Sequence, residues 1–580
     1  MSAEKLITDH IDIWTSAVQA KSSSGRGSGK KREIYGIKKL RELILELAVR
    51  GKLVQQDPTD EPASVLLERI AAEKAQLVKD GKIKKSKSFP DLSPEELNFD
   101  LPNGWQWCRV GELFLSIASG GTPSKREPAY WDGDIPWASV KDLGKSKLLH
   151  DTQDHISDAG LIAGSRLANI DDLLICTRMG LGKIAIVKTP MAFNQDLKSA
   201  TLSKFIQTDF FLNSYSTIKI TGTGTTVAGI TQDQLLNYVF ALPPMSEQHR
   251  IVAKVDELMA LCDQLEQQTE ASLDAHQVLV ETLLATLTNS QDATELMANW
   301  TRISEHFDTL FTTEQSIDQL KQTILQLAVM GKLVPQDPND EPAAKLLERI
   351  AEEKAQLVKE KKIKKEKPQP FISEDGRLFE LPNGWVWSNI GETFLVTGGL
   401  QKTPKRTPVL NHYPYLAVAN VQRGRLELDD LKRFEVTSEE LERYRLMPGD
   451  LMVVEGNGSE NEIGRCAIWS GEVQDCLHQN HLIKCRPLSL DLSSWVLQTL
   501  NSPFGIAVMK SLAVTSSGLY NLSVGKIRSI AFPLPPLKEQ HRIVAKVDGL
   551  MALCDQLKSR LQTSQQTQLA LAEALVEQAL

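Results

Sequence analysis

The stretch EQHRIVAKVD occupies Glu247–Asp256 and returns without a single change at Glu539–Asp548. It is the centre of a longer repeat, LPPMSEQHRIVAKVDELMALCDQLE (Leu242–Glu266) against LPPLKEQHRIVAKVDGLMALCDQLK (Leu534–Lys558), which we call the EQHR segment. Self-similarity of this kind marks a structural unit that the chain uses more than once. One frame is therefore present in two copies, with other material between them.

A second repeat precedes each copy. Leu47–Lys85, the GKLV segment, returns at Leu327–Lys365 with 31 of 39 positions identical. LPNGW also occurs twice, at the same offset of 280, whereas the EQHR segments are 292 residues apart. The chain thus runs GKLV segment, insert one, EQHR segment, GKLV segment, insert two, EQHR segment. Insert two is 12 residues longer than insert one.

The repeated segments are predicted to be helices, because their apolar residues recur at steps of three and four. The helix after Pro243 and Pro244 is expected to continue to about Leu287. The first EQHR segment and the second GKLV segment are joined in the middle of the chain, and the missing pair lies at the two ends. If the ends meet, they complete a second helical unit around a pseudo-two-fold axis. The residues assigned to this helical frame and its partner interface are Ile251, Val255, Leu258, Leu265, Ile324, Leu327, Ile543, Val547 and Leu550.

The inserts have a different composition, rich in Gly, Thr, Asn and short β-branched runs. Leu173–Val187 and Leu451–Trp469 each read as a strand, a glycine-containing loop and a second strand. We therefore predict an α+β fold, with two α/β modules separated by long antiparallel, coiled-coil-like helices. The expected divisions are an N-terminal helical region (1–100, with a flexible stretch at 20–32), module 1 (101–242), a central helical spacer (243–380), module 2 (381–534) and a C-terminal helix (535–580).

Composition places the protein among cytoplasmic globular chains. Apolar residues make up 41% of the 580, and seven cysteines without a C-x-x-C pair indicate a reducing compartment. The start, MSAEKLITDHIDIW, has acids where a secretory signal would be basic. The net charge of −8 argues against strong unaided binding to nucleic acid. Residues 101–241 carry 13 basic and 13 acidic side chains, and residues 381–533 carry 15 of each, so neither module has a basic excess.

Motifs for catalysis are missing. GKS at Gly144–Ser146 lacks the first glycine of a phosphate-binding loop, because Ser139 stands there. The Leu-Pro-Pro pairs lack the polar first residue and aromatic fourth residue of an aminomethyltransferase motif. Cys476, His478, His481 and Cys485 could bind zinc, but their spacing fits no standard site, and the comparable stretch Ala192–Leu202 has neither Cys nor His. We expect no catalytic residue and no metal site.

Four features together resemble one known family. They are the SGGTPS, YW and IPW run at Ser119–Trp137, the paired LPNGW sequences, the two PP-x-x-EQ-x-x-I sequences and the duplicated GKLV-x-QDP. The chain resembles the specificity subunit of Type I restriction-modification systems over essentially its full length. The resemblance implies that two target-recognition domains each read one half of a split, asymmetric site in double-stranded DNA. A non-catalytic interaction scaffold of a phage-defence complex without methylation is the alternative.

The resemblance also implies partners and cofactors. Two methyltransferase subunits would dock on the helical frame and bring S-adenosylmethionine. Restriction and translocase subunits would bring ATP and Mg²⁺, and this chain would bind no cofactor itself. No membrane is involved.

Candidate DNA contacts follow from side-chain chemistry and loop position. Arg and Lys suit guanine, Asn and Gln suit adenine, and Lys or hydroxyl groups hold phosphates. In module 1 the candidates are Thr122, Ser124, Lys125, Arg126, Lys141, Arg178, Lys183 and Gln195. In module 2 they are Gln401, Lys402, Lys405, Arg406, Asn420, Arg423, Asn457, Arg465, Asn480 and Tyr520. We interpret Trp105, Trp131, Trp137 and Trp385 as core anchors.

Overall fold

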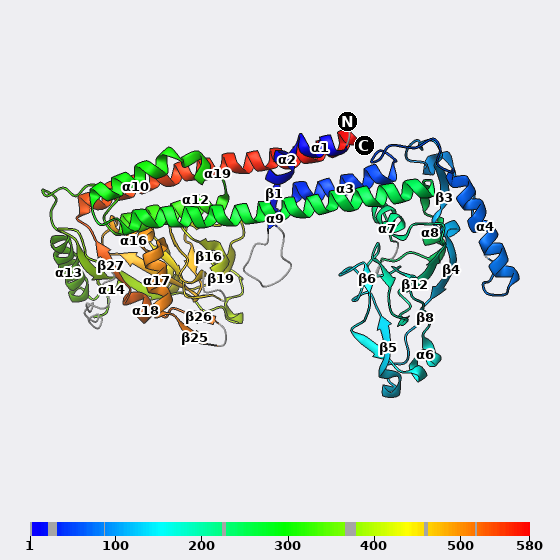
Figure 1. Cartoon of the computed structure of the whole chain (residues 1–580). Coiled ribbons are helices and arrows are strands. Elements are labelled where there is room, and N and C mark those ends of the chain that lie inside the picture. The colour runs from blue at the N-terminus through cyan, green and yellow to red at the C-terminus, as the bar shows by residue number, and fades with distance from the viewer. Residues whose placement is uncertain are drawn as a thin grey trace. The chain divides into compact units, whose positions relative to one another are not determined.

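The computed structural model describes residues 3–20, 32–85, 88–222, 228–365, 379–457, 462–516 and 519–580. Almost all of the expected flexible stretch at 20–32 lies outside these residues. The chain forms two compact units, Met1–Ser272 with Ser564–Leu580, and Leu273–Thr563. Each unit contains one module and its own frame helices (Figure 1). None of the helices described is long and apolar enough to cross a membrane.

In the first unit the frame consists of α3 (Tyr35–Val49), α4 (Ala63–Lys79) and the first part of α9 (Met245–Asn289). The predicted length of α9 is confirmed to within two residues. Its stripe of Ile251, Val255 and Leu258 is fully buried in the core of this unit. The corresponding helices of the second unit are α12 (Glu314–Val329), α13 (Ala343–Lys359) and the first part of α19 (Leu537–Ala579).

The two ends of the chain meet, as the repeat pattern predicts. The Tyr35 hydroxyl donates to Glu573 Oε1 at 2.5 Å, and Lys52 Nζ donates to the Leu580 carbonyl at 2.7 Å. Ala572 is completely buried with residues of α1 (Ala3–Thr8), α2 (Ile11–Ser16) and α3. The end of α19 therefore belongs to the core of the first unit.

The early and the later parts of the long helices pack against different repeats, which the sequence alone does not show. Each EQHR segment packs on the GKLV segment of its own repeat, as the ion pairs of Arg250 with Asp60 and of Arg542 with Asp340, both at 2.7 Å, show. The later parts of the long helices pack differently. Residues 273–289 of α9 belong to the second unit with α10 (Ala293–Glu305), and residues 564–579 of α19 belong to the first. Each long helix thus begins in its own repeat and ends among the helices of the other.

Module 1 contains two sheets. The larger sheet has the order β4-β12-β9-β10-β6, and the smaller has the order β7-β5-β11-β8. The strands of the larger sheet are β4 (Phe114–Ser119), β12 (Leu197–Leu202), β9 (Leu173–Cys176), β10 (Ile184–Val187) and β6 (Leu148–Leu149). Those of the smaller sheet are β7 (Asp154–Ile156), β5 (Trp131–Ala138), β11 (Met191–Phe193) and β8 (Leu167–Ala168).

Module 2 has the same order of core strands although its sequence is different, and each of its sheets has one strand fewer among the described residues. Its larger sheet has the order β15-β24-β20-β22, and its smaller sheet has the order β19-β16-β23. The strands are β15 (Phe394–Gly398), β24 (Leu482–Pro487), β20 (Leu451–Val454), β22 (Cys466–Ile468), β19 (Lys432–Glu435), β16 (His412–Leu416) and β23 (Leu477–His478). In both modules one pair of the smaller sheet, β5 with β11 or β16 with β23, is parallel. The four shared strands of the larger sheet pair antiparallel, and in module 1 β6 adds a parallel pair with β10.

The duplicated motifs form the base of each module. LPNGW leads into β3 (Gln106–Arg109) or β14 (Val386–Asn389), which pair antiparallel with β13 (Val239–Leu242) or β27 (Ala531–Leu534) just before the Pro-Pro pairs. Each module therefore begins and ends on two neighbouring strands. This pairing brings the GKLV and EQHR segments of one repeat together.

A buried glutamate locks that base in each repeat. Glu247 accepts from Trp105 Nε1 at 2.9 Å and from Gln56 Nε2 at 3.2 Å. Glu539 accepts in the same way from Trp385 at 3.0 Å and from Gln336 at 3.2 Å. Burial raises the pKa of both carboxyl groups. We call each glutamate with its tryptophan and glutamine a clasp, and the clasps explain why these residues are duplicated.

Candidate nucleic-acid interface

Four chain segments gather at one edge of the larger sheet of module 1. Ser119 at the end of β4 pairs with Lys198 at the start of β12, and Leu197 pairs with Cys176 at the end of β9. Ile184 at the start of β10 pairs with Ile175. The loop after β4, the turn before β12 and the β9–β10 hairpin consequently leave the sheet together. We call this the module 1 edge.

Module 2 has the same edge at corresponding strand positions. Gly398 at the end of β15 pairs with Ile483, and Leu482 at the start of β24 pairs with Val454 at the end of β20. Cys466 at the start of β22 pairs with Val453. The register makes Gln195 the counterpart of Asn480 and Lys183 the counterpart of Arg465. Both pairs had been selected as candidates from the sequence alone.

One glycine in each module lets two segments of the edge pass close to each other. They are the loop after β4 and the turn before β12 in module 1, and the loop after β15 and the turn before β24 in module 2. A Cβ atom on Gly120 would lie 2.3 Å from the carbonyl oxygens of Phe193 and Asn194. A Cβ atom on Gly399 would meet the Gln479 and His478 carbonyl oxygens at 2.3 and 2.5 Å. Such distances exclude any larger residue. The glycines of SGGTPS and GGLQKTP thus set the geometry of the two edges.

At the module 1 edge most candidate side chains face solvent. Ser124, Lys125, Arg126, Lys141, Lys183 and Gln195 are exposed. Arg178 is 53% exposed and lies 3.6 Å from Asp196. The Thr122 hydroxyl donates a hydrogen bond to Gln195 Oε1, so those two side chains form one polar group. The edge offers an exposed basic and amide surface, which is the chemistry that phosphates and base edges require.

At the module 2 edge the candidates divide into two groups. Gln401, Lys402 and Lys405 are exposed, and Asn480 and Tyr520 are half-buried. For Asn457 only its place in β21 (Gly456–Asn457), paired with Tyr520, is described. These residues lie in or next to the segments that leave the module 2 edge.

The remaining four module 2 candidates are engaged inside the protein. Arg406 pairs with Glu440 at 2.8 Å, and Asn420 is buried, accepting from the Ala417 amide. Arg423 donates to the Ile463 carbonyl, and Arg465 donates to Gln422 and the Val418 carbonyl. These contacts hold loops that carry the edge. Sequence chemistry alone could not separate an arginine that reads DNA from one that braces a loop.

A buried aspartate lies at the end of each larger sheet opposite the edge, with different partners in the two modules. Asp172 accepts from the Ser199 and Thr201 hydroxyls at 3.1 and 2.7 Å. Its counterpart Asp450 accepts two hydrogen bonds from Arg486, at 2.8 and 2.7 Å. Ser199 corresponds to Lys484, whose pKa burial lowers to about 8. The same position thus uses neutral hydroxyls in module 1 and cations in module 2.

The Cys and His cluster of module 2 does not converge. Cys476 and Cys485 are buried in different apolar clusters, and His481 faces solvent beside Glu455 at 3.4 Å. His478 is fully buried, and burial lowers its pKa to about 3. In the described part of the chain no group of three or more His, Cys, Asp or Glu residues is arranged to hold a metal ion.

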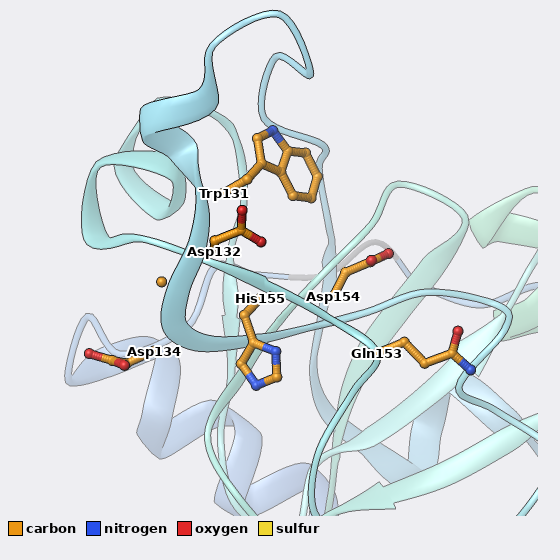
Figure 2. A pocket seen from close by; sticks show the side chains of 7 residues that line it. Trp131, Asp132, Asp134, Gln153, Asp154 and His155 are labelled. Atoms are coloured by element: carbon orange, nitrogen blue, oxygen red, sulfur yellow. The ribbon is translucent and has the colours of Figure 1, made fainter.

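A polar hollow of about 390 Å³ lies at the far end of β5 from the module 1 edge (Figure 2). Trp131, Asp132, Asp134, Asp154 and His155 are among its lining residues. Three carboxylates make this hollow repulsive to phosphate.

The four tryptophans interpreted as core anchors differ in burial. Trp105, Trp137 and Trp385 are buried, as expected of core anchors, whereas Trp131 is half-buried.

The apolar residues assigned to the frame and partner interface face inward. Ile251, Val255, Ile324 and Ile543 are at most 2% exposed, and only Leu550 of the assigned residues is half-buried. They hold the helices together within the chain. Little of these side chains is left exposed to a partner subunit.

The comparisons with known proteins place this architecture in a family. Residues 102–275 match the family model "Type I restriction modification DNA specificity domain". The chain is 42% identical to the Type I restriction enzyme EcoEI specificity subunit of Escherichia coli, over the full length of both. It is 43% identical to the EcoAI specificity subunit of the same organism, again over 100% of each chain. The chain belongs to the family of Type I restriction-modification specificity subunits.

Membership confirms the resemblance seen in the sequence. Members of this family recognise DNA within a multisubunit complex and are not themselves catalysts, so the scaffold alternative is not favoured. A solved structure described as "Structural basis underlying complex assembly and conformational transition of the type I R-M system" covers 83% of this chain and 98% of its own, with a TM-score of 0.47 and 17% identity.

Some side chains at the edges escaped prediction from sequence. Lys198 is half-buried and donates to Ser119 Oγ at 2.7 Å, and His481 and Met179 are exposed. The signal for Lys198 and His481 was the strand register between the two modules, which becomes visible only when the sheets are paired. Met179 was missed because an apolar residue has no polar group to suggest a role.

Proposed function

We propose that each module reads one half of a split, asymmetric sequence in double-stranded DNA through its sheet edge. One observation carries this proposal. Both modules form the same edge, with the same strand order and a glycine at the same close approach, but with different side chains. A common geometry with different chemistry suits two different half-sites held by one protein. We propose 101–242 and 381–534 as the two target-recognition domains.

Family membership supports a proposal for the remaining parts of the complex. We propose that two methyltransferase subunits carrying S-adenosylmethionine dock on the duplicated frame, one for each repeat. Restriction and translocase subunits would supply ATP and Mg²⁺. A chromosomal DNA target would place the complex in the cytoplasm. The target base would be flipped into a methyltransferase subunit, since base-modifying enzymes take their base out of the helix.

The electrostatics of the modules limit what the chain does alone. Each module carries equal numbers of basic and acidic residues, 13 of each and 15 of each. Few counterions are released when such a surface meets DNA, so binding by the isolated chain should be weak and sensitive to salt. Nanomolar binding by the purified monomer at physiological salt would contradict this.

The test is to co-express the chain with the methyltransferase subunit encoded beside it, in a host without adenine methylation. Modified adenines are then mapped across the genome by direct sequencing. We expect one motif made of two short blocks separated by an unspecified spacer. A stable complex that modifies no such motif would remove the proposal.

A further inference from the structure

An apolar side chain stands at the tip of the module 1 edge, between its cations. Met179 is 71% exposed and lies in the β9–β10 hairpin, next to Arg178 and four residues before Lys183. Single exposed apolar residues are common on protein surfaces. Met179 differs from them in its backbone, its support and its surroundings.

The backbone of Met179 is left-handed, with φ of 62°. The other non-glycine residues with positive φ in the described part of the chain are Asp132, Asp171, Lys361 and Asp475. Asp adopts this conformation readily, whereas a bulky apolar residue there is unusual. Strain of this kind concentrates at functional positions and persists only when the surroundings enforce it.

The base of the hairpin is fixed by neighbouring segments. The Thr177 amide donates to the Asp196 carbonyl at 2.9 Å, and the Ile230 amide donates to the Thr177 carbonyl at 2.9 Å. Leu181, two residues beyond Met179, packs against the core of the first unit. The hairpin therefore buries one apolar side chain and presents the other to solvent.

A two-stranded ribbon fits the major groove of B-DNA, where the thymine methyl is the apolar group that a side chain can contact. Arg178 and Lys183 suit the phosphates on either side. We propose that Met179 reads a thymine through its C5-methyl group in the half-site of module 1. This inference rests on the proposed function, because it assigns one base contact to the same edge.

The corresponding hairpin of module 2 lacks such a side chain. Between Val454 and Cys466 the sequence is EGNGSENEIGR, whose one large apolar residue, Ile463, is 3% exposed. The dependence on a thymine methyl through this hairpin should therefore be confined to the half-site of module 1. That asymmetry gives an internal control on the same DNA duplex.

The experiment uses the complex of this chain with its methyltransferase partner and a duplex containing the mapped site. Each thymine is replaced in turn by deoxyuridine, which removes only the methyl group. We expect the wild-type complex to bind about fourfold more weakly at one thymine of the module 1 half, the effect of one buried methyl. Met179→Gly, which suits the positive φ, should bind the unmodified duplex more weakly by a similar factor and no longer distinguish thymine from deoxyuridine.

The control variant is Met297→Ala, which truncates a methionine that is 65% exposed on α10. It should keep the wild-type thymine dependence. Sequence-specific binding without dependence on any thymine of that half, or discrimination retained by Met179→Gly, would overturn this inference alone. Failure of the wild-type complex to bind any specific sequence would remove the proposed function and the inference with it.

Discussion

The clasps match residue for residue between the two repeats, whereas the sheet edges share strand order and few side chains. Glu247 and Glu539 each accept from one tryptophan and one glutamine, at distances that agree within 0.1 Å. At the edges, Thr122, Arg178 and Gln195 correspond to Gln401, Gly456 and Asn480. The two repeats have identical residues where side chains hold the backbone in place, and different residues where side chains face outward.

The buried residues of the modules lie between these two cases, because their positions correspond while their side chains or partners differ. Asp172 and Asp450 occupy the same place at the end of the larger sheet opposite the edge, yet one has hydroxyl partners and the other has an arginine. Phe193 and His478 also occupy equivalent positions, and both are completely buried. The fold therefore requires a buried acceptor and a large buried ring at these places, and it tolerates different chemistry around them. The following predictions test this comparison.

The largest difference is expected between the two buried aspartates. Asp450→Ala leaves Arg486 without its buried partner and should lower the free energy of unfolding by about 3–5 kcal/mol. Asp172→Ala leaves two hydroxyls and the Asn169 amide without this acceptor and should cost about 1–3 kcal/mol. Amide hydrogen exchange in β20 and β9 measures the two effects in one chain. Equal losses would show that the exchange of partners has no energetic consequence.

The clasps should respond equally. Glu247→Ala and Glu539→Ala each leave a buried indole N–H without an acceptor, at a cost of about 1–3 kcal/mol. The glutamine amide loses one acceptor and keeps another, the carbonyl of Gly51 or Gly331. Local hydrogen exchange in β3 and β14 is the measurement. Glu→Gln at either position keeps one acceptor oxygen and serves as the milder control. A large loss in one repeat and none in the other would refute the equivalence of the two frames.

Acid should destabilise module 2 through a group that module 1 lacks. Burial lowers the pKa of His478 to about 3, whereas an exposed histidine titrates near 6.5. Between these values the unfolded chain binds a proton that the folded chain does not. Stability should thus fall by about 1.4 kcal/mol for each pH unit below about 6.5. Hydrogen exchange in β24 at pH 7 and pH 5 tests this.

The matched variant is His478→Phe, which places the module 1 residue in module 2. It should remove this pH dependence while leaving β12 of module 1 unaffected. If the variant keeps the full acid sensitivity, another group must be responsible.

The smallest effect is expected from single phosphate contacts. Lys125→Ala in module 1 and Lys402→Ala in module 2 should each weaken DNA binding by the complex uniformly across sequences, and each should reduce the salt slope by about one. Binding titrations at several salt concentrations give the slope. Lys188→Ala is the control, because Lys188 pairs with Asp171 at 2.6 Å beyond the other end of β10. A sequence-dependent change would mean that these lysines contact bases.

Much of the fold could be predicted because the chain repeats itself. The offsets of LPNGW and EQHR predict two modules of unequal length, and the apolar spacing predicts the end of α9 to within two residues. The common topology of the modules was hidden, since Phe193 and His478 or Ser199 and Lys484 share no obvious property. It was also not predictable that the later part of each long helix packs with the helices of the other repeat, because the same apolar stripe suits either partner.

The candidate site was predictable in outline and not in detail. Loop position and side-chain chemistry found the exposed Lys125, Lys183 and Gln195. The same reasoning selected Arg406 and Arg465, whose partners Glu440 and Gln422 lie far away in sequence. Only the packed structure shows that these arginines are engaged.

The central claim is that the two edges read independently on a common frame. Replacing 381–534 with a second copy of 101–242 tests it most directly, because LPNGW and the Pro-Pro sequences supply matching junctions. The altered chain is co-expressed with its methyltransferase partner and its methylated motif is mapped. We expect a symmetric motif with the half-site of module 1 on both sides of the spacer. Methylation of the original asymmetric motif would contradict it.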